Sequence, residues 1–231
     1  MEKSAPSREK SGDVLYRRVG ESNRIKEKGT SDVGAREAMK DTVGIVLAGG
    51  MSRRFGGEKS LASRDGKAFV QYSLEALKHL DETVLVTRED LMTDMPRLDK
   101  VRVIPDLQAY RGMGPLAGIF SAMARVKSRW YAVLPCDTPW IHRGVVCRLL
   151  ALRDEKWDVI CSRVNRELQP LIAIYHGRTK NKIRLYLDQR KLSVRGFLLD
   201  CAVKEVDFDE KRWFYNVNTR EDWIRFSQKM G

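Results

Sequence analysis

The stretch that decides the fold is T-V-G-I-V-L-A-G-G-M-S-R-R-F-G-G-E-K-S-L, residues 42–61. Residues 43–47 are apolar and rich in β-branched side chains, which predicts a buried parallel strand. Three small residues follow at once: Ala48, Gly49 and Gly50. Because glycine has no side chain, the backbone N–H groups of such a loop can come close to an anion. The stretch therefore predicts a strand that leads directly into an anion-binding loop.

Two basic residues of the same stretch, Arg54 and Lys59, add positive charge. The P-loop is excluded because it ends in Gly-Lys-Ser/Thr, whereas Glu58 stands before Lys59 here. The dinucleotide fingerprint G-x-G-x-x-G is absent as well. The simpler alternative is a glycine-rich turn with solvated basic residues. The position directly after a buried strand favours a cradle for a triphosphate.

The rest of the chain alternates apolar runs with helical patterns. Strands are expected at residues 83–86, 101–104, 130–134, 158–161, 171–175 and 203–208, and helices at 68–80, 116–126 and 143–152. This alternation predicts an α/β fold, a single Rossmann-like three-layer domain with a mostly parallel sheet flanked by helices. The domain is expected to span residues 42–231, and a Thr219–Asp222 pair to cap a final helix.

The first 41 residues are polar, with both signs of charge interleaved, and predict a disordered tail. Met39 immediately precedes the domain, so we hypothesise that it is the true initiator. Retention of residue 1 in native protein, measured by intact mass, would contradict an artefactual extension.

Ligands of parallel sheets bind beyond the carboxyl ends of the strands. Four residues fall just past expected strand ends: Ala48, Thr87, Asp106 and Asp137. Asp137 follows a strand that should be fully buried, where a carboxylate needs a cation, and Mg²⁺ prefers such oxygen ligands. The alternative is a helix cap, a role that Thr138 also suits. Cys136 is interpreted as a small buried residue rather than a nucleophile.

Two further segments each allow two interpretations. The loop R-G-M-G-P-L-A-G, residues 111–118, suits either close approach to a nucleotide or tight packing of a helix on the sheet. The basic run between Arg178 and Arg195 suits either a solvated helix face or a groove for a second phosphorylated substrate. The sequence alone leaves both pairs open.

Composition narrows the class of partner. The chain has 231 residues and a net charge of +12, which suits anionic partners. No stretch resembles a nucleic-acid-binding module, which makes nucleic acid an unexpected partner. No apolar stretch is long enough to span a bilayer. The four cysteines lack C-x-x-C spacing, and without a signal peptide the cytoplasm is the expected location.

The motif L-A-G-G-x-S-x-R-F-G-x-E-K, residues 47–59, resembles the signature of sugar-nucleotide-type nucleotidyltransferases. Within them the chain is most similar to the MobA family of molybdenum cofactor guanylyltransferases. Three further motifs agree, namely G-P-L-A-G at 114–118, P-C-D-T-P at 135–139 and N-V-N-T at 216–219. The resemblance covers the chain from about residue 43 onward.

This resemblance implies a nucleotidyltransferase fold and the transfer of GMP from GTP to the terminal phosphate of molybdopterin. It also implies contacts between nucleotide and residues Leu47, Ala48, Gly49, Gly50, Lys59, Thr87, Asp106, Gly114 and Asp137. Arg54, Lys59 and Asp137 are the implied catalytic residues, with Mg²⁺ held by Asp137 and Asn218. The family often has asparagine where this chain has Thr87. Transient contact with proteins that supply or receive the cofactor is implied as well.

Other functions remain open at this stage. Gly49-Gly50 resembles guanylyl members, whereas cytidylyl relatives tend to carry Ala-Gly there. The alternatives are therefore a CTP-dependent cytidylyltransferase, or an enzyme acting on a sugar phosphate or cobinamide phosphate. An alternative of another class is a non-catalytic nucleotide- or RNA-binding module.

Overall fold

The computed structural model describes residues 41–50, 55, 58, 60–64 and 67–229. The strands are β1 (Thr42–Leu47), β2 (Ser63–Arg64), β3 (Lys67–Ala68), β4 (Glu82–Thr87), β5 (Val101–Pro105), β6 (Trp130–Pro135), β7 (Val159–Val164), β8 (Glu167–His176) and β9 (Val203–Asp207). The helices are α2 (Phe69–Leu77), α3 (Pro115–Arg125), α4 (Arg143–Leu150), α5 (Thr179–Asp188), α6 (Val194–Leu199) and α7 (Arg220–Lys229). Short 3-10 turns are η1 (Glu89–Leu91), η2 (Gln108–Tyr110) and η3 (Lys211–Phe214).

Seven strands form one sheet in the order β5-β4-β1-β6-β8-β7-β9. β8 runs antiparallel to both of its neighbours, and the other pairs are parallel. β2 and β3 form a separate antiparallel pair. The mostly parallel sheet that the sequence predicts is therefore confirmed.

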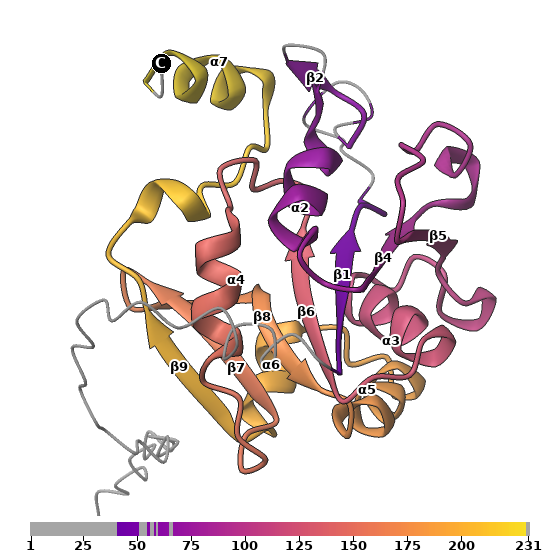
Figure 1. The fold of residues 1–231 in the computed structure, drawn as a ribbon. Coiled ribbons are helices and arrows are strands. Elements are labelled where there is room, and N and C mark those ends of the chain that lie inside the picture. Colours follow the sequence, from indigo (N-terminus) through magenta and orange to yellow (C-terminus); the bar gives the residue numbers. More distant parts are fainter. Residues whose placement is uncertain (1–40, 51–54, 56–57, 59, 65–66, 230–231) are drawn as a thin grey trace, which may run out of the picture. The chain divides into compact units, whose positions relative to one another are not determined.

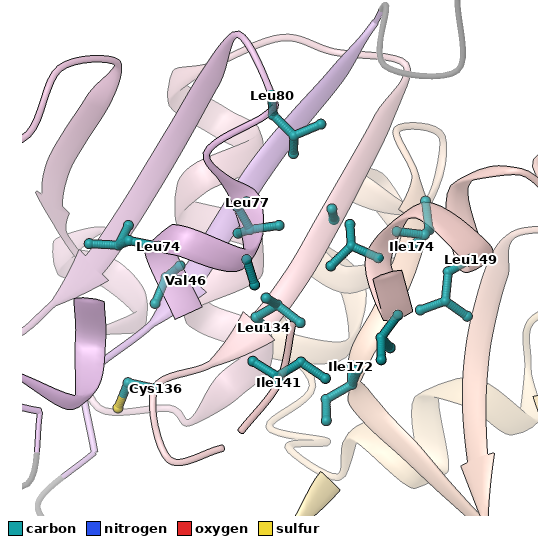
Figure 2. Close-up of a cluster of buried hydrophobic side chains, with 14 of the residues drawn as sticks. Val46, Leu74, Leu77, Leu80, Leu134, Cys136, Ile141, Leu149, Ile172 and Ile174 are labelled. Atoms are coloured by element: carbon teal, nitrogen blue, oxygen red, sulfur yellow. The ribbon is translucent and has the colours of Figure 1, made fainter. Parts of the chain in front are cut away.

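Side chains of β1 alternate between two cores, one on each face of the sheet. Val46 packs with Leu77 of α2 and Leu149 of α4, a cluster that Figure 2 shows with Cys136 among its members. Ile45 packs on the opposite face, with residues of α3, α5 and α6. Helices therefore cover both faces, as Figure 1 shows, and the three-layer prediction is confirmed. Each fully buried Ile or Leu contributes about 1.5–3 kcal/mol.

The reversed strand β8 follows β7 through a two-residue turn. Asn165 and Arg166 have φ values of 52° and 66°, as a tight hairpin turn requires. The strand expected at residues 171–175 begins earlier, at Glu167, so Pro170 lies within β8. The pairing register of β7 shifts between Cys161 and Ser162, across from this segment, and such an irregularity tolerates a residue without an N–H.

Some predictions fall outside the described residues. The residues outside the described part include Arg54, Lys59 and residues 1–40, Met39 among them. The disordered tail and the domain boundary at residue 41 therefore remain predictions. Among the helices that are described, none is long and apolar enough to cross a membrane.

Candidate active site

Four parallel strands end at the same edge of the sheet. Leu47 lies opposite both Val86 and Pro135, and Thr87 lies opposite Pro105. The chain leaves these strands at Ala48, Arg88, Asp106 and Cys136. The shared edge that the sequence predicts is therefore confirmed.

The glycine loop begins from a fixed point on this edge. The Ala48 N–H donates to the Val86 carbonyl at 2.7 Å, and the Cys136 N–H donates to the Leu47 carbonyl at 3.0 Å. The Ala48 side chain is buried, whereas Gly49 and Gly50 are exposed, with open space where a Cβ would point. No side chain therefore stands between solvent and the backbone at Gly49.

The second glycine-rich loop meets the first at Gly118. A Cβ built on Gly118 would lie 2.7 Å from Leu47 Cδ2 and 3.7 Å from Asp106 Oδ1. Glycine here allows α3 to pack closely on the strand end, which favours the packing interpretation for this residue. Gly114 is different, because it is exposed, has φ +79° and precedes α3 with open space around it. In this loop Gly118 therefore allows close packing of α3 on the sheet, whereas Gly114 remains accessible.

Asp106 lies at the end of β5, half-buried beside this loop. Burial raises its pKa, against the opposing effects of the Gly112 N–H and of Arg125 and Arg111. A carboxylate already short of hydration is well suited to accept hydrogen bonds from a nucleotide.

Thr87 ends β4 and is 1% exposed. Within the part of the chain that the structure describes, its hydroxyl is buried without a hydrogen-bond partner. Its expected contact with nucleotide remains a prediction, and it requires this hydroxyl to become accessible.

The segments that carry Asp137 and Asn218 meet although they are far apart in the sequence. The Val217 N–H donates to the Asp137 carbonyl at 2.9 Å, so the residue before Asn218 lies against the backbone of Asp137. The Asp222 carboxylate accepts from the Asn218 and Thr219 N–H groups at 3.0 and 2.9 Å. The Asp222 N–H in turn donates to Thr219 Oγ1 at 3.0 Å, so the predicted cap of α7 is confirmed.

The turn that carries Asp137 is held by contacts with the carbonyl oxygen of Pro135. Ser73 of α2 donates to the Pro135 carbonyl at 2.7 Å, and Thr138 Oγ1 lies 3.5 Å from the same oxygen. The cap of α4 is His142, which accepts from the Gly144 N–H, so the alternative that Thr138 caps this helix is wrong. Cys136 is buried in the core cluster of Figure 2, as expected of a small apolar residue.

An aromatic cluster joins the signature stretch to the segments that carry Asp137 and Asn218. Phe69 packs against Phe55 of the signature stretch and Trp223 of α7, with ring centroids 5.8 and 4.5 Å apart. Val217 belongs to this cluster, and Trp140 lies 5.8 Å from Trp223. The sequence does not predict this cluster, because the spacing of its residues along the chain shows no regular pattern.

The donor set at Asp137 and Asn218 suits a hard cation, because both side chains offer oxygen. Among the described residues, no group of three His, Cys, Asp or Glu side chains could hold a metal ion. Two protein ligands fit Mg²⁺, which commonly completes its shell with water and substrate phosphates.

The start of the basic run lies away from this edge. Arg178 and Lys182 pair with Asp158 at 2.6 and 3.8 Å, and the Gly177 N–H donates to the Arg129 carbonyl just before β6 begins. These contacts favour a structural role for both basic residues over a substrate groove.

A sequence profile described as the MobA-like NTP transferase domain matches residues 44–202. The chain belongs to this family. A probable molybdenum cofactor guanylyltransferase of Bacillus anthracis is 39% identical over 192 residues, covering 81% of this chain and 96% of the relative. A Bacillus cereus protein of the same name is 38% identical with the same coverage. The resemblance to this family that the signature motifs indicate is thus confirmed. The prediction that the protein is a nucleotidyltransferase is confirmed with it.

Solved structures show the same fold in this family. Molybdopterin-guanine dinucleotide biosynthesis protein A from Archaeoglobus fulgidus has a TM-score of 0.69 at 24% identity, covering 81% of this chain and 98% of that one. Rv0371c from Mycobacterium tuberculosis has a TM-score of 0.64 at 19% identity, covering 81% and 97%. At these identities the likeness shows the fold alone.

Proposed function

We propose that this protein transfers GMP from GTP to the terminal phosphate of molybdopterin and releases pyrophosphate. The observation that carries the proposal is the meeting of two strand ends. β1 leads into the exposed residues Gly49 and Gly50, and its neighbour β6 leads into Asp137, whose carbonyl accepts from the residue before Asn218. The names of the Bacillus relatives support guanylyl transfer to the molybdenum cofactor.

The chemistry needs little covalent help from the protein. An oxygen of the acceptor phosphate attacks the α-phosphorus of GTP, the bond to the bridging oxygen breaks, and pyrophosphate leaves with that oxygen. The attacking oxygen is already anionic, so no general base is required. The difficulty is the approach of two anions, and positioning with charge neutralisation dominates such reactions.

Different residues would bind the phosphates, neutralise charge, hold the metal ion and contact the nucleoside. The N–H groups near Gly49 and Gly50 would hold phosphates, and Arg54 and Lys59 would add positive charge during the transfer. Asp137 and Asn218 would hold Mg²⁺, which supplies positive charge to the triphosphate when it is bound. Leu47, Ala48, Asp106 and Gly114 would line the nucleoside, and Thr87 would contribute if its hydroxyl turns toward it.

The location and partners follow the same proposal. All four cysteines, Cys136, Cys147, Cys161 and Cys201, are free thiols. Free thiols are typical of a reducing cytoplasm, where we place the reaction. Proteins that supply or receive the pterin are the expected transient partners.

The deciding experiment measures pyrophosphate release from GTP, CTP, UTP and ATP with Mg²⁺, with and without molybdopterin. We expect release with GTP that depends on molybdopterin, together with a dinucleotide product identified by its mass. Faster release with CTP would replace the guanylyl assignment by a cytidylyl one. Salt-sensitive RNA binding without pyrophosphate release would support the non-catalytic alternative instead.

A further inference from the structure

We infer that Arg88 is a positioning residue that holds the far end of the glycine loop for nucleotide binding. The inference rests on the function proposed above, because it names a residue that serves the same site. Arg88 directly follows β4, the strand to which the start of the loop is already attached.

The residues on either side of the loop are attached to β4 and to Arg88 directly after it. Its start is held by the hydrogen bond from the Ala48 N–H to the Val86 carbonyl at 2.7 Å. Its far end is held by the Arg88 guanidinium, whose two terminal nitrogens lie 2.7 and 3.3 Å from the two carboxylate oxygens of Glu58. A guanidinium–carboxylate pair with two hydrogen bonds fixes the relative orientation of the two groups as well as the distance between them. Ala48 and Glu58, the described residues on either side of the loop, are therefore attached to β4 and to the residue that follows it.

Glu58 is anchored through its backbone as well as its side chain. Its carbonyl accepts from the N–H groups of Leu61 and Ala62, both at 3.0 Å. These bonds build the turn that follows the loop. Lys59, which is assigned a catalytic role in the function proposed above, is the next residue in the sequence.

Arg88 is suited to position the loop rather than to bind phosphate itself. Its guanidinium also pairs with Asp90, with nitrogen–oxygen distances of 3.1 and 2.7 Å. Two carboxylates thus neutralise its charge and occupy its donors. The Asp90 side chain is 65% exposed, against 34% for Glu58, so the pair with Asp90 lies on the solvent side. Asp90 therefore offers a matched control that leaves the loop contact intact.

The test compares Arg88→Met, Glu58→Gln, the double variant and the control Asp90→Asn. Calorimetric titration with Mg–GTP gives the dissociation constant, and steady-state kinetics give KM for each substrate. We expect Arg88→Met to raise the GTP dissociation constant and KM roughly fivefold, with KM for molybdopterin unchanged. The double variant should match the single ones, because both remove the same contact. Asp90→Asn should bind GTP as the wild type does.

Hydrogen exchange separates this inference from the proposed function. Peptides covering residues 48–62 should exchange faster in Arg88→Met than in Asp90→Asn, with or without nucleotide. A wild type that binds no GTP would overturn the proposed function, while the exchange comparison still tests the anchor. Equal exchange in both variants, or unchanged GTP affinity in Arg88→Met, would overturn the positioning role.

Discussion

The backbone N–H of Val217 donates to the carbonyl oxygen of Asp137 at 2.9 Å. This bond joins the turn after β6 to the segment before α7, and it uses no side-chain atom of the acid. The carboxylate of Asp137 can therefore be changed without removing the contact that brings Asn218 to it. The metal role of the two residues can be tested while the fold is kept.

Asp137→Ala should reduce turnover by about a hundred- to a thousandfold, the typical cost of removing a group that stabilises transition-state charge. Asn218→Ala should raise the Mg²⁺ concentration needed for half-maximal activity. Both variants should unfold within a few degrees of the wild type in thermal melts. Full activity of Asp137→Ala would remove the acid from the proposed metal site.

Asp106→Asn should separate function from stability. Burial raises the pKa of Asp106 in the folded protein. At pH values above the pKa of the unfolded state, the ionised carboxylate therefore lowers the free energy of unfolding. The amide relieves that cost, and the free energy of unfolding at pH 7 should equal or exceed that of the wild type. GTP affinity should fall, measured by calorimetric titration. A clear loss of stability would show that the carboxylate is needed for folding.

Gly118→Ala should weaken nucleotide binding with little change in stability. The added Cβ would displace Leu47, whose Cδ2 lies 2.7 Å away. Overpacking costs about 1–3 kcal/mol, while alanine in a helix gains about 1 kcal/mol over glycine. The double variant Gly118→Ala with Leu47→Val removes the clashing methyl group and should recover affinity. If only a large loss of stability is seen, the effect is on folding and not on the nucleotide site.

Trp223→Ala should lower the free energy of unfolding by about 1–3 kcal/mol, because it removes ring contacts with Phe69 and Trp140. It should also weaken GTP binding, since Phe55 of the signature stretch packs against the same Phe69. The matched control is Ile224→Ala, whose side chain is 55% exposed. Equal effects of both variants in urea unfolding would contradict the aromatic anchor.

The Asp158 carboxylate should make stability depend on acid pH. Burial acts to raise its pKa, but the Ala202 N–H and the Arg178 guanidinium outweigh it, so the pKa lies below 3.8. Its contribution is therefore complete above the unfolded pKa near 4 and is lost as pH falls through the lower folded pKa. Asp158→Ala should cost about 2–3 kcal/mol at pH 7 and less near pH 3. Asp154→Ala, which removes an exposed pair with Lys156, should change the free energy of unfolding far less than Asp158→Ala does.

The type of the main strands and helices, and their order along the chain, could be predicted because the spacing of apolar residues indicates which face of each element is buried. Residues just past strand ends, such as Asp106 and Asp137, could be predicted because the strand ends of a parallel sheet share one edge. The reversal of β8 could not, since a buried strand has the same apolar pattern in either direction. The pairing of Glu58 with Arg88 was missed for a related reason, because contacts between distant segments leave no local pattern.

The short turn between β7 and β8 has a consequence for how such enzymes diversify. Because β7 runs parallel to β1, its end at Val164 and the residues Asn165 and Arg166 lie at the same edge as the nucleotide loops. Hairpin tips accept insertions and new sequence more readily than helical crossovers do. An insertion at this hairpin would therefore change the surface beside the proposed nucleotide site while β1, β4 and β6 stay unchanged.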